Sequence, residues 1–327
     1  EFEAKHGMHL RSGCEPEMSW IGPSVDVVSR PGTSPAYHGG TLDMMRPVFQ
    51  RVIRYAQALG LDMVEGDYED NGQLELNWMF DRAELTADRL ITYRQICHQV
   101  GRELGVTPSF MAKPYTGVMG NGCHHNVSLW QGDRNMCMEQ GRKDLHVNDT
   151  ARYMLGGMLT HAAASMLIMG TTVNSYKRLV PGFEAPVHIS WARNNRSGLI
   201  RVPVPKRGSV SATRIEYRSP DPACNPYLAF SVILAAGLRG IEQGYELPPE
   251  ADSNLFEMDD SALAALGIDT LPQSLSDSLR VMERSDLARE ALGEHIFEWF
   301  LRNKRHEWRS YKTHVSQFEL DRYLRAL

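Results

Sequence analysis

The stretch SATRIEYRSPDPACNPY, residues 211–227, has the pattern of a short strand, a turn and the start of a helix. Side chains on a strand alternate between its two faces, which separates three charged residues from two apolar ones: Arg214, Glu216 and Arg218 against Ile215 and Tyr217. Burying a row of charges is costly unless the charges are paired. The pattern therefore predicts a strand with a charged inner face, which is typical of a binding site and not of a core.

The composition is that of a folded protein. Of the 327 residues, 42% are hydrophobic and 23% are charged, which is enough for a substantial core and argues against general disorder. The formal net charge of −5 argues against a nucleic-acid partner, although an arginine-lined pocket can lie inside an acidic protein.

The five cysteines and one apolar segment bear on the protein's location. The cysteines form no C-x-x-C pair and predict free thiols in a reducing cytoplasm. Residues 154–170 are apolar but contain His161 and several glycines, so we expect a buried helix here and no membrane span.

Hydrophobic periodicity predicts the order of the elements. We expect strands at 8–20, 73–80, 122–130 and 212–218, and helices at 43–59, 87–104, 150–170, 226–243 and within 273–327. Thr86 is the expected N-cap of the second helix, which ends at Gly105, and Asn225-Pro226 opens the fourth. Residues 180–210 are expected to form a loop. Strands in pairs with helices between them favour an α+β fold with an antiparallel sheet.

Acidic side chains share strand faces in four separate segments. The set comprises five carboxylates and one imidazole: Glu15, Glu17, Glu69, Glu75, Glu216 and His124. Clustered carboxylates raise one another's pKa, and a divalent cation relieves that repulsion. Many carboxylates with one imidazole and no thiolate suit Mg²⁺ or Mn²⁺ better than Zn²⁺. Each glutamate alone would be read as part of a solvated strand face, but the six residues together favour a metal site.

Basic residues gather in the glycine- and proline-rich segment 174–205. They are Lys177, Arg178, Arg193, Arg196 and Arg201. Guanidinium groups bind carboxylates and phosphates through two parallel hydrogen bonds, and arginines beside a divalent metal are typical of phosphoryl transfer. The alternative is a basic surface loop or a network of ion pairs with Glu184.

Five motifs together resemble the catalytic domain of glutamine synthetase. They are GCEPE (13–17), NGQLE (71–75), FMAKPYTGVMGNGCHHNVSLW (110–130), NSYKRLVPGFEAPVHISWARNNRSGLIRVP (174–203) and RIEYRSPDPACNPYLAF (214–230). The resemblance implies an α+β fold over residues 1–327, with metal ligands on a curved antiparallel sheet and helices on its outer face. It also implies that the family's small N-terminal β-grasp domain is absent from this sequence, and that the intact protein forms a large homo-oligomer.

The resemblance implies an ATP-dependent, ADP-forming ligase that uses Mg²⁺ or Mn²⁺. Such an enzyme joins the γ-carboxylate of L-glutamate to ammonia or a primary amine through γ-glutamyl phosphate. The sequence leaves the nitrogen donor open. Two alternatives are an inactive scaffold of the same family, which should have lost metal ligands, and a guanidino kinase-like phosphotransferase, which would not need the paired carboxylates.

The resemblance also implies individual roles. One metal would be held by Glu17, Glu69 and Glu75, and the other by Glu15, His124 and Glu216. Glutamate would be bound by Arg178, Gly120 and Arg218, and the phosphoryl group by Arg196 and Arg201. Asn126 and Ser128 would approach ATP, Tyr37 would border the ammonium pocket, and Glu184 would lie on a flap that shields the acyl phosphate.

Some positions depart from the family pattern. Met119 replaces a frequent asparagine, and Asn126 stands where a second histidine is common. The segment between Glu69 and Glu75 is one residue shorter than in many relatives, so Asp67 is the alternative ligand to Glu69. Phe256 occupies the place of a tyrosine that is modified in some bacterial members, which argues against that form of control.

Overall fold

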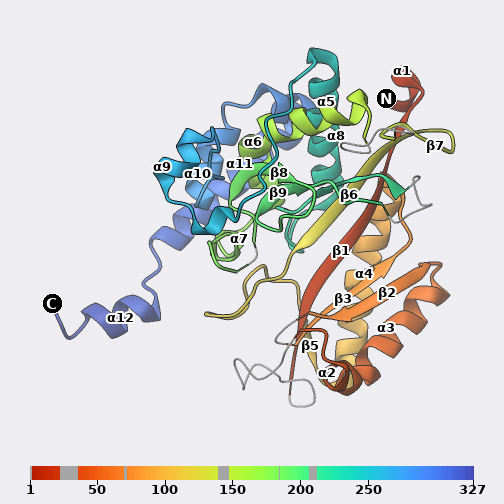
Figure 1. Cartoon of the computed structure of the whole chain (residues 1–327). Helices are drawn as coiled ribbons and strands as arrows, with labels where there is room; N and C mark the ends of the chain where they lie inside the picture. The colour runs from red at the N-terminus through yellow and green to blue at the C-terminus, as the bar shows by residue number, and fades with distance from the viewer. Residues whose placement is uncertain (1, 23–35, 70–71, 139–146, 184, 206–211) are drawn as a thin grey trace.

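The computed structural model describes the chain except residues 1, 23–35, 70–71, 139–146, 184 and 206–211 (Figure 1). Its main sheet has the order β2-β3-β1-β6-β10-β9-β8, with β4 and β5 added to β1 and β7 to β6. The strands are β1 (His9–Ile21), β2 (Met63–Tyr68), β3 (Gln73–Trp78), β4 (Asp81–Arg82), β5 (Thr107–Ser109), β6 (Cys123–Gln131), β7 (Arg134–Asn135), β8 (His188–Ala192), β9 (Gly198–Arg201) and β10 (Ile215–Tyr217).

Antiparallel pairing dominates this sheet, as the sequence predicts. Among the described strands, β8 and β9 form a parallel pair. The prediction of a loop over 180–210 is wrong at these two strands. Both are short and buried on both faces, so they lack the alternation by which a half-exposed strand is recognised.

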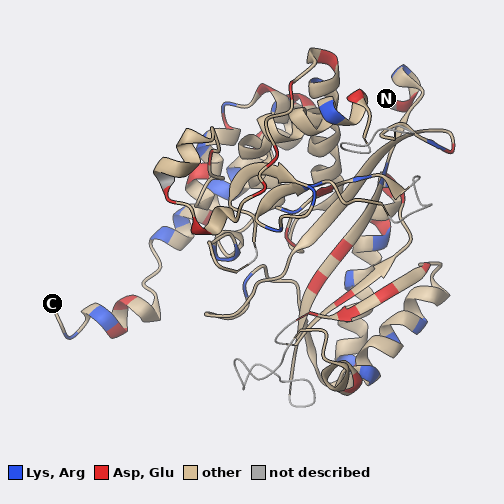
Figure 2. Ribbon diagram, in the orientation of Figure 1, with Lys and Arg blue, Asp and Glu red and all other residues tan. Residues whose placement is uncertain are grey.

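The long strand β1 separates the apolar core from a charged face. Its even-numbered residues Leu10, Cys14, Met18 and Trp20 are buried in the main hydrophobic cluster. The odd-numbered Glu15 and Glu17 point the other way because side chains alternate along a strand. Figure 2 shows acidic segments on β1, β2 and β3.

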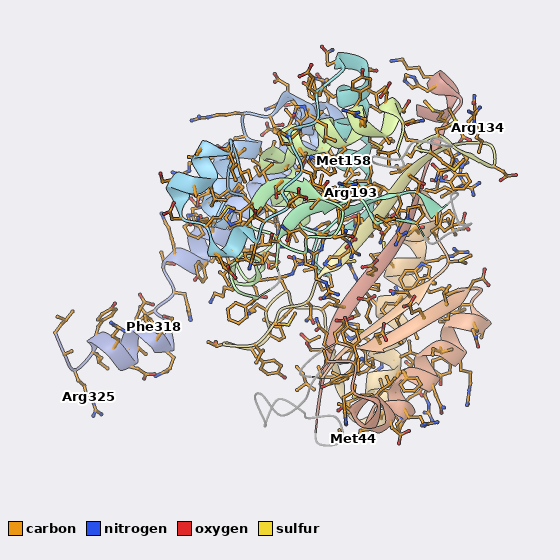
Figure 3. The ribbon with its side chains drawn as sticks, viewed as in Figure 1. Met44, Arg134, Met158, Arg193, Phe318 and Arg325 are labelled. Atoms are coloured by element: carbon orange, nitrogen blue, oxygen red, sulfur yellow. The ribbon has the colours of Figure 1, made fainter. Side chains whose placement is uncertain are left out.

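Helices cover the apolar side of the sheet (Figure 1). The described helices are α1 (Phe2–His6), α2 (Gly39–Met44), α3 (Arg46–Ala58), α4 (Ala83–Leu104), α5 (Asp149–Thr160), α6 (Ala162–Met169), α7 (Ser175–Arg178), α8 (Pro226–Gln243), η2 (Leu255–Glu257), α9 (Asp260–Ala265), α10 (Leu275–Met282), α11 (Asp286–Lys312) and α12 (Gln317–Tyr323). α4 packs on β1 and α5 packs on α8. α12, which carries Phe318, stands apart from the body (Figures 1 and 3).

Helix boundaries confirm some expectations and correct others. Gly105 ends α4 with a φ of 67°, and the Asn225 side chain caps α8 by accepting a hydrogen bond from Tyr227 N at 3.0 Å. The prediction of Thr86 as an N-cap is wrong, because α4 begins at Ala83 directly after β4. Thr86 lies inside the helix, and its hydroxyl donates to Ser12 O at 2.8 Å.

The helix predicted over 150–170 is two helices, α5 and α6, which meet at His161. Likewise, the residues of the predicted helix 43–59 divide between α2 and α3 at Met45. Among the described residues, no helix combines the length and the apolar character that crossing a membrane requires.

The contact between α5 and α8 depends on two glycines. A Cβ at Gly157 would lie 2.1 Å from Ala236 O, and a Cβ at Gly240 would lie 2.1 Å from Tyr153 O. Both neighbours are backbone atoms of the facing helix and cannot rotate away. The two backbones can therefore approach this closely only without side chains at these positions.

We expect Gly240→Ala to lower the free energy of unfolding by about 1–3 kcal/mol, because the added methyl group overpacks the contact between α5 and α8. The measurement is urea unfolding followed by circular dichroism. Gly39→Ala is the matched control, since a Cβ there meets nothing within 4 Å, and it should leave the midpoint nearly unchanged. Equal midpoints for Gly240→Ala and the wild type would contradict this packing.

Candidate active site

A polar cavity of about 290 Å³ lies on the charged face of the sheet. Every metal ligand that the sequence predicts lines it: Glu15, Glu17, Glu69, Glu75, His124 and Glu216. The predicted residues Tyr37, Gly120, Arg178, Arg196, Arg201 and Arg218 line it as well. Strands far apart in the sequence therefore deliver acidic and basic groups to one volume.

The first acidic cluster consists of Glu15, His124 and Glu216. Strand register creates it, because Glu15 of β1 lies opposite His124 of β6, and β10 pairs with the other edge of β6. His124 Nδ1 lies 3.2 Å from Glu15 Oε2 and 3.5 Å from Glu216 Oε1. One potential ligand atom from each residue falls within 4.8 Å of the other two. Two carboxylates and one imidazole at this spacing fit a hard divalent cation.

The second acidic cluster is more open. Glu17 of β1 lies opposite Glu75 of β3, and both carboxylates face the cavity. The Glu17 carboxylate accepts hydrogen bonds from Gln73 Nε2 at 2.9 Å and from the Gly122 backbone N–H. Glu69 accepts a hydrogen bond from the Tyr37 hydroxyl at 3.0 Å. Glu69 lines the cavity and Asp67 does not.

The protonation equilibria of Glu15 and Glu75 are pushed in opposite directions. Burial opposes ionisation of Glu15, but hydrogen bonds from His124 and Asn126 outweigh it and lower the pKa of that carboxyl to about 2. Burial raises the pKa of Glu75 to about 9, and the negative charges of Glu15 and Glu17 add to the effect. Burial and the charge of Glu17 also raise the pKa of Glu69. The side chains alone therefore leave the second cluster short of positive charge.

Arginines that are buried or partly buried line the cavity beside the acidic clusters. Arg178 is 4% exposed and donates to the backbone oxygens of Ser219 at 3.1 Å and Arg218 at 3.2 Å. Burial lowers the pKa of Arg178, and the charge of Glu17 opposes that shift. Arg201 and Arg218 both pair with the Glu216 carboxylate. Arg193, by contrast, pairs with Glu250 and does not line the cavity.

Gly120 permits the close approach of Arg178 to the cavity wall. A Cβ at this position would lie 2.4 Å from Ala112 O and 2.9 Å from Arg178 Cγ.

Tyr37, which also lines the cavity, is the one described non-glycine residue with a positive φ, at 59°. A residue held in this unfavourable backbone region marks a tightly specified position.

A second pocket of about 370 Å³ adjoins the polar cavity. The two share four lining residues: Glu15, Glu65, Asn77 and Arg214. The second pocket also contains the apolar side chains Val64, Phe80 and Trp130, together with the predicted residues Asn126 and Ser128. Asn126 donates to Glu15 at 2.7 Å and accepts from Arg214 at 2.8 Å, so it links the two spaces. A ligand with a charged end and a flat apolar end would fit across both.

The sequence analysis missed several residues of the site. Gln73, Asn77 and Glu65 line the polar cavity, and Arg214 had no assigned role. Gln73 shares a strand face with Glu75, so the alternation already applied to that strand could have identified it. Glu65 could not be found in this way because β2 was not predicted. Glu184 lies outside the described residues.

A family model described as "Glutamine synthetase, catalytic domain" matches residues 7–323. The chain is 41% identical to the glutamine synthetase of Mycolicibacterium smegmatis over 305 residues, covering 93% of this chain and 68% of that protein. It is 45% identical to that of Mycobacterium tuberculosis strain H37Rv over 253 residues, covering 77% of this chain and 56% of that protein. The chain therefore spans between about half and two thirds of the length of these two relatives.

Two solved structures have the same fold. One, described as "GmaS/ADP complex-Conformation 1", has a TM-score of 0.87, 32% identity and coverage of 98% of this chain and 74% of that one. The other, "Apo GmaS without ligand", has a TM-score of 0.86 and 33% identity over the same shares of the two chains. The predicted α+β fold and the family resemblance are thereby confirmed.

The raised pKa of Glu75 predicts a pH-dependent stability of the metal-free protein. The folded state holds a proton on Glu75 up to about pH 9, whereas the unfolded carboxyl releases it near its ordinary pKa of 4.5. Stability from this group is therefore complete below about pH 4.5 and falls as the pH rises toward 9. In EDTA, Glu75→Gln should raise the melting temperature, and by more at pH 8 than at pH 5. A shift at pH 8 that is negative, or no larger than the shift at pH 5, would contradict the raised pKa of Glu75.

Proposed function

The chain belongs to the glutamine synthetase catalytic-domain family, and we propose that it catalyses ATP-dependent ligation of L-glutamate to ammonia or a primary amine. The observation that carries this proposal is the cavity in which acidic ligands and buried arginines face one another. Residues 1–327 would form one catalytic domain of an oligomeric enzyme.

The acidic clusters are proposed to hold two divalent cations. Glu15, His124 and Glu216 would bind one, and Glu17, Glu75 and Glu69 the other. The oxygen-rich donor set fits Mg²⁺ or Mn²⁺. Burial and the neighbouring charges of Glu15 and Glu17 raise the pKa of Glu75, and a bound cation would favour its ionised form. Bound cations would neutralise phosphate charge and fix the orientation of the phosphates.

The arginines are proposed to position the anionic groups of the substrates. Arg178, whose side chain is fixed by two backbone oxygens, would bind the α-carboxylate of glutamate beside Gly120. Arg218 would hold the γ-carboxylate, and Arg196 and Arg201 would stabilise the phosphoryl group in transfer. Glu184 would shield the acyl phosphate from water, a role that stays a prediction from the sequence.

The adjoining pocket is proposed to bind the nucleotide. Its apolar residues Val64, Phe80 and Trp130 offer contacts to a base, and Asn126 and Ser128 line the same pocket. One of the two similar solved structures is described as an ADP complex, which supports this assignment. The triphosphate would extend past Glu15 and Arg214, which line both spaces.

The nitrogen donor is proposed to enter beside Tyr37 and Glu69. The carboxylate of Glu69, hydrogen-bonded to the Tyr37 hydroxyl, can attract an ammonium or alkylammonium ion. Burial raises the pKa of Glu69, which suits a group that takes a proton from the donor before it attacks.

Product formation with a panel of donors tests the proposal. We expect the purified protein with ATP, Mg²⁺ and glutamate to release ADP upon addition of ammonia, methylamine, an aromatic amine or a polyamine, with a preference among them. Glu216→Ala should abolish turnover with every donor, because it removes a ligand and the partner of two arginines. Glu290→Ala, an exposed carboxylate paired with Arg239, is the control and should retain activity.

Two results would contradict the proposal. One is ADP release that does not depend on glutamate, and the other is wild-type turnover in Glu216→Ala. Turnover with a guanidino compound in place of glutamate and amine would favour the phosphotransferase alternative.

A further inference from the structure

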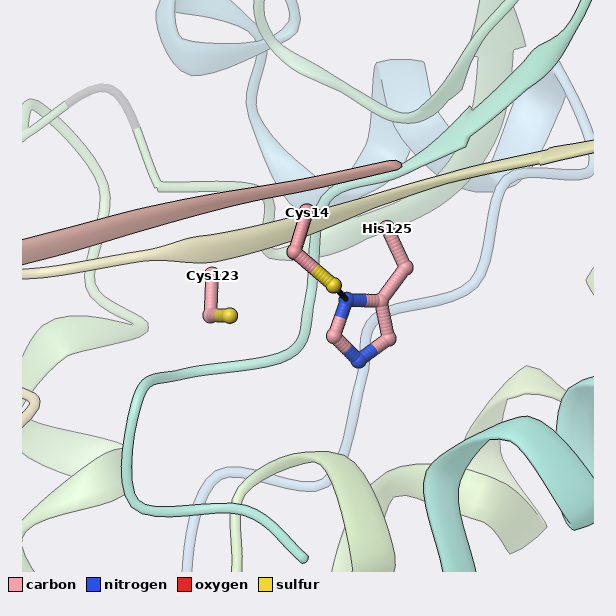
Figure 4. Close-up of side chains that lie close together, drawn as sticks. All are labelled: Cys14, Cys123 and His125. Carbon is pink, nitrogen blue, oxygen red and sulfur yellow. Dashed lines mark hydrogen bonds between the residues drawn. The ribbon is translucent and has the colours of Figure 1, made fainter. Parts of the chain in front are cut away.

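Behind the acidic cluster, on the apolar side of the sheet, lies a second group of metal-ligating side chains: Cys14, Cys123 and His125 (Figure 4). Strand alternation produces it, because Cys14 precedes Glu15 on β1 while Cys123 and His125 flank His124 on β6. One potential ligand atom from each of the three lies within 4.8 Å of the other two. All three residues are at most 2% exposed.

The spacing of Cys14 and His125 is compatible with two ligands of a tetrahedral metal site. Cys14 Sγ lies 3.4 Å from His125 Nδ1, and Figure 4 shows both atoms pointing toward each other. Zinc bonds of about 2.3 Å to sulfur and about 2.0 Å to nitrogen, at a tetrahedral angle, separate the two ligand atoms by roughly 3.5 Å. The observed spacing therefore needs little adjustment to accept the ion.

The surroundings of His125 give an independent reason to expect a ligand. The imidazole is 0% exposed and packs against the Phe230 ring at 4.7 Å. Among the described residues, the polar groups that approach the ring are the thiols of Cys14, Cys123 and Cys224, which are weak hydrogen-bond partners. A buried histidine usually has stronger partners, because an unsatisfied polar atom is costly in an apolar interior.

A divalent cation with affinity for sulfur would give His125 Nδ1 a stronger partner than a thiol. Two thiolates and a neutral imidazole around Zn²⁺ carry no net charge, so the complex can stay in the apolar core without a large desolvation penalty. A hard cation would prefer the carboxylates on the other face, which offer oxygen ligands.

We propose that Cys14, Cys123 and His125 form a structural site for Zn²⁺ in the core, separate from the carboxylate sites in the cavity. The ion would bind the three side chains after loss of the two thiol protons. It would join β1 to β6 at the residues adjacent to Glu15 and His124. Its role would be to fix the two strands whose opposite faces supply the acidic cluster.

Cobalt substitution tests this site without any mutation. The protein is produced in cells grown with Co²⁺ in place of Zn²⁺, and weakly held metal is removed with EDTA. We expect a near-ultraviolet charge-transfer band from thiolate to cobalt, together with intense visible bands of tetrahedral cobalt. The carboxylate sites contain no sulfur and cannot give the charge-transfer band. Zinc-grown protein should retain stoichiometric zinc by mass spectrometry after the same treatment.

Variants assign the signal to the core site. Cys123→Ser should reduce retained zinc and the cobalt band by more than about tenfold. Cys97→Ser, a buried cysteine outside the cluster, should retain both, and so should Glu216→Ala on the opposite face. Wild-type protein without a charge-transfer band and without retained zinc would overturn the proposal, whether or not the Cys123 variant folds.

Discussion

Electrostatic repulsion among carboxylates on one face of the sheet is the constraint on which the site depends. The register of β1 with β3 and β6 brings Glu15, Glu17 and Glu75 into one cavity, where burial raises the pKa of Glu75 and the charges of Glu15 and Glu17 raise it further. Arg201 and Arg218 relieve the repulsion around Glu216 but leave Glu75 crowded. The divalent cations proposed here would supply the positive charge that this arrangement lacks.

The same alternation that exposes carboxylates on one face of β1 builds the core on the other. Met18 and Trp20 anchor the strand among the helices, while their neighbours in sequence reach the cavity. A change in register by one residue would exchange these faces and destroy both the core and the site. Fold and chemistry are therefore specified by one pattern, which explains why acidic residues are tolerated within a strand that is largely buried.

The sequence was most informative where residues alternate along half-buried strands. It predicted β1, β3, β6 and β10. All the residues proposed from it as metal ligands line the cavity. It failed for β8 and β9, since strands buried on both faces carry no alternation, and for Thr86, because the start of α4 is set by β4 and by the contact with Ser12. The roles of individual residues came from family resemblance, and neither spacing nor composition could have supplied them.

The most direct test of the central claim is the location of bound cations. Crystals of the protein grown with Mn²⁺ and a non-hydrolysable ATP analogue allow an anomalous difference map to be calculated at the manganese edge. Peaks among Glu15, His124 and Glu216 and beside Glu17 and Glu75 are the predicted result. A cavity with ordered carboxylates and no anomalous peak would contradict the claim that shared cations hold these acidic side chains together.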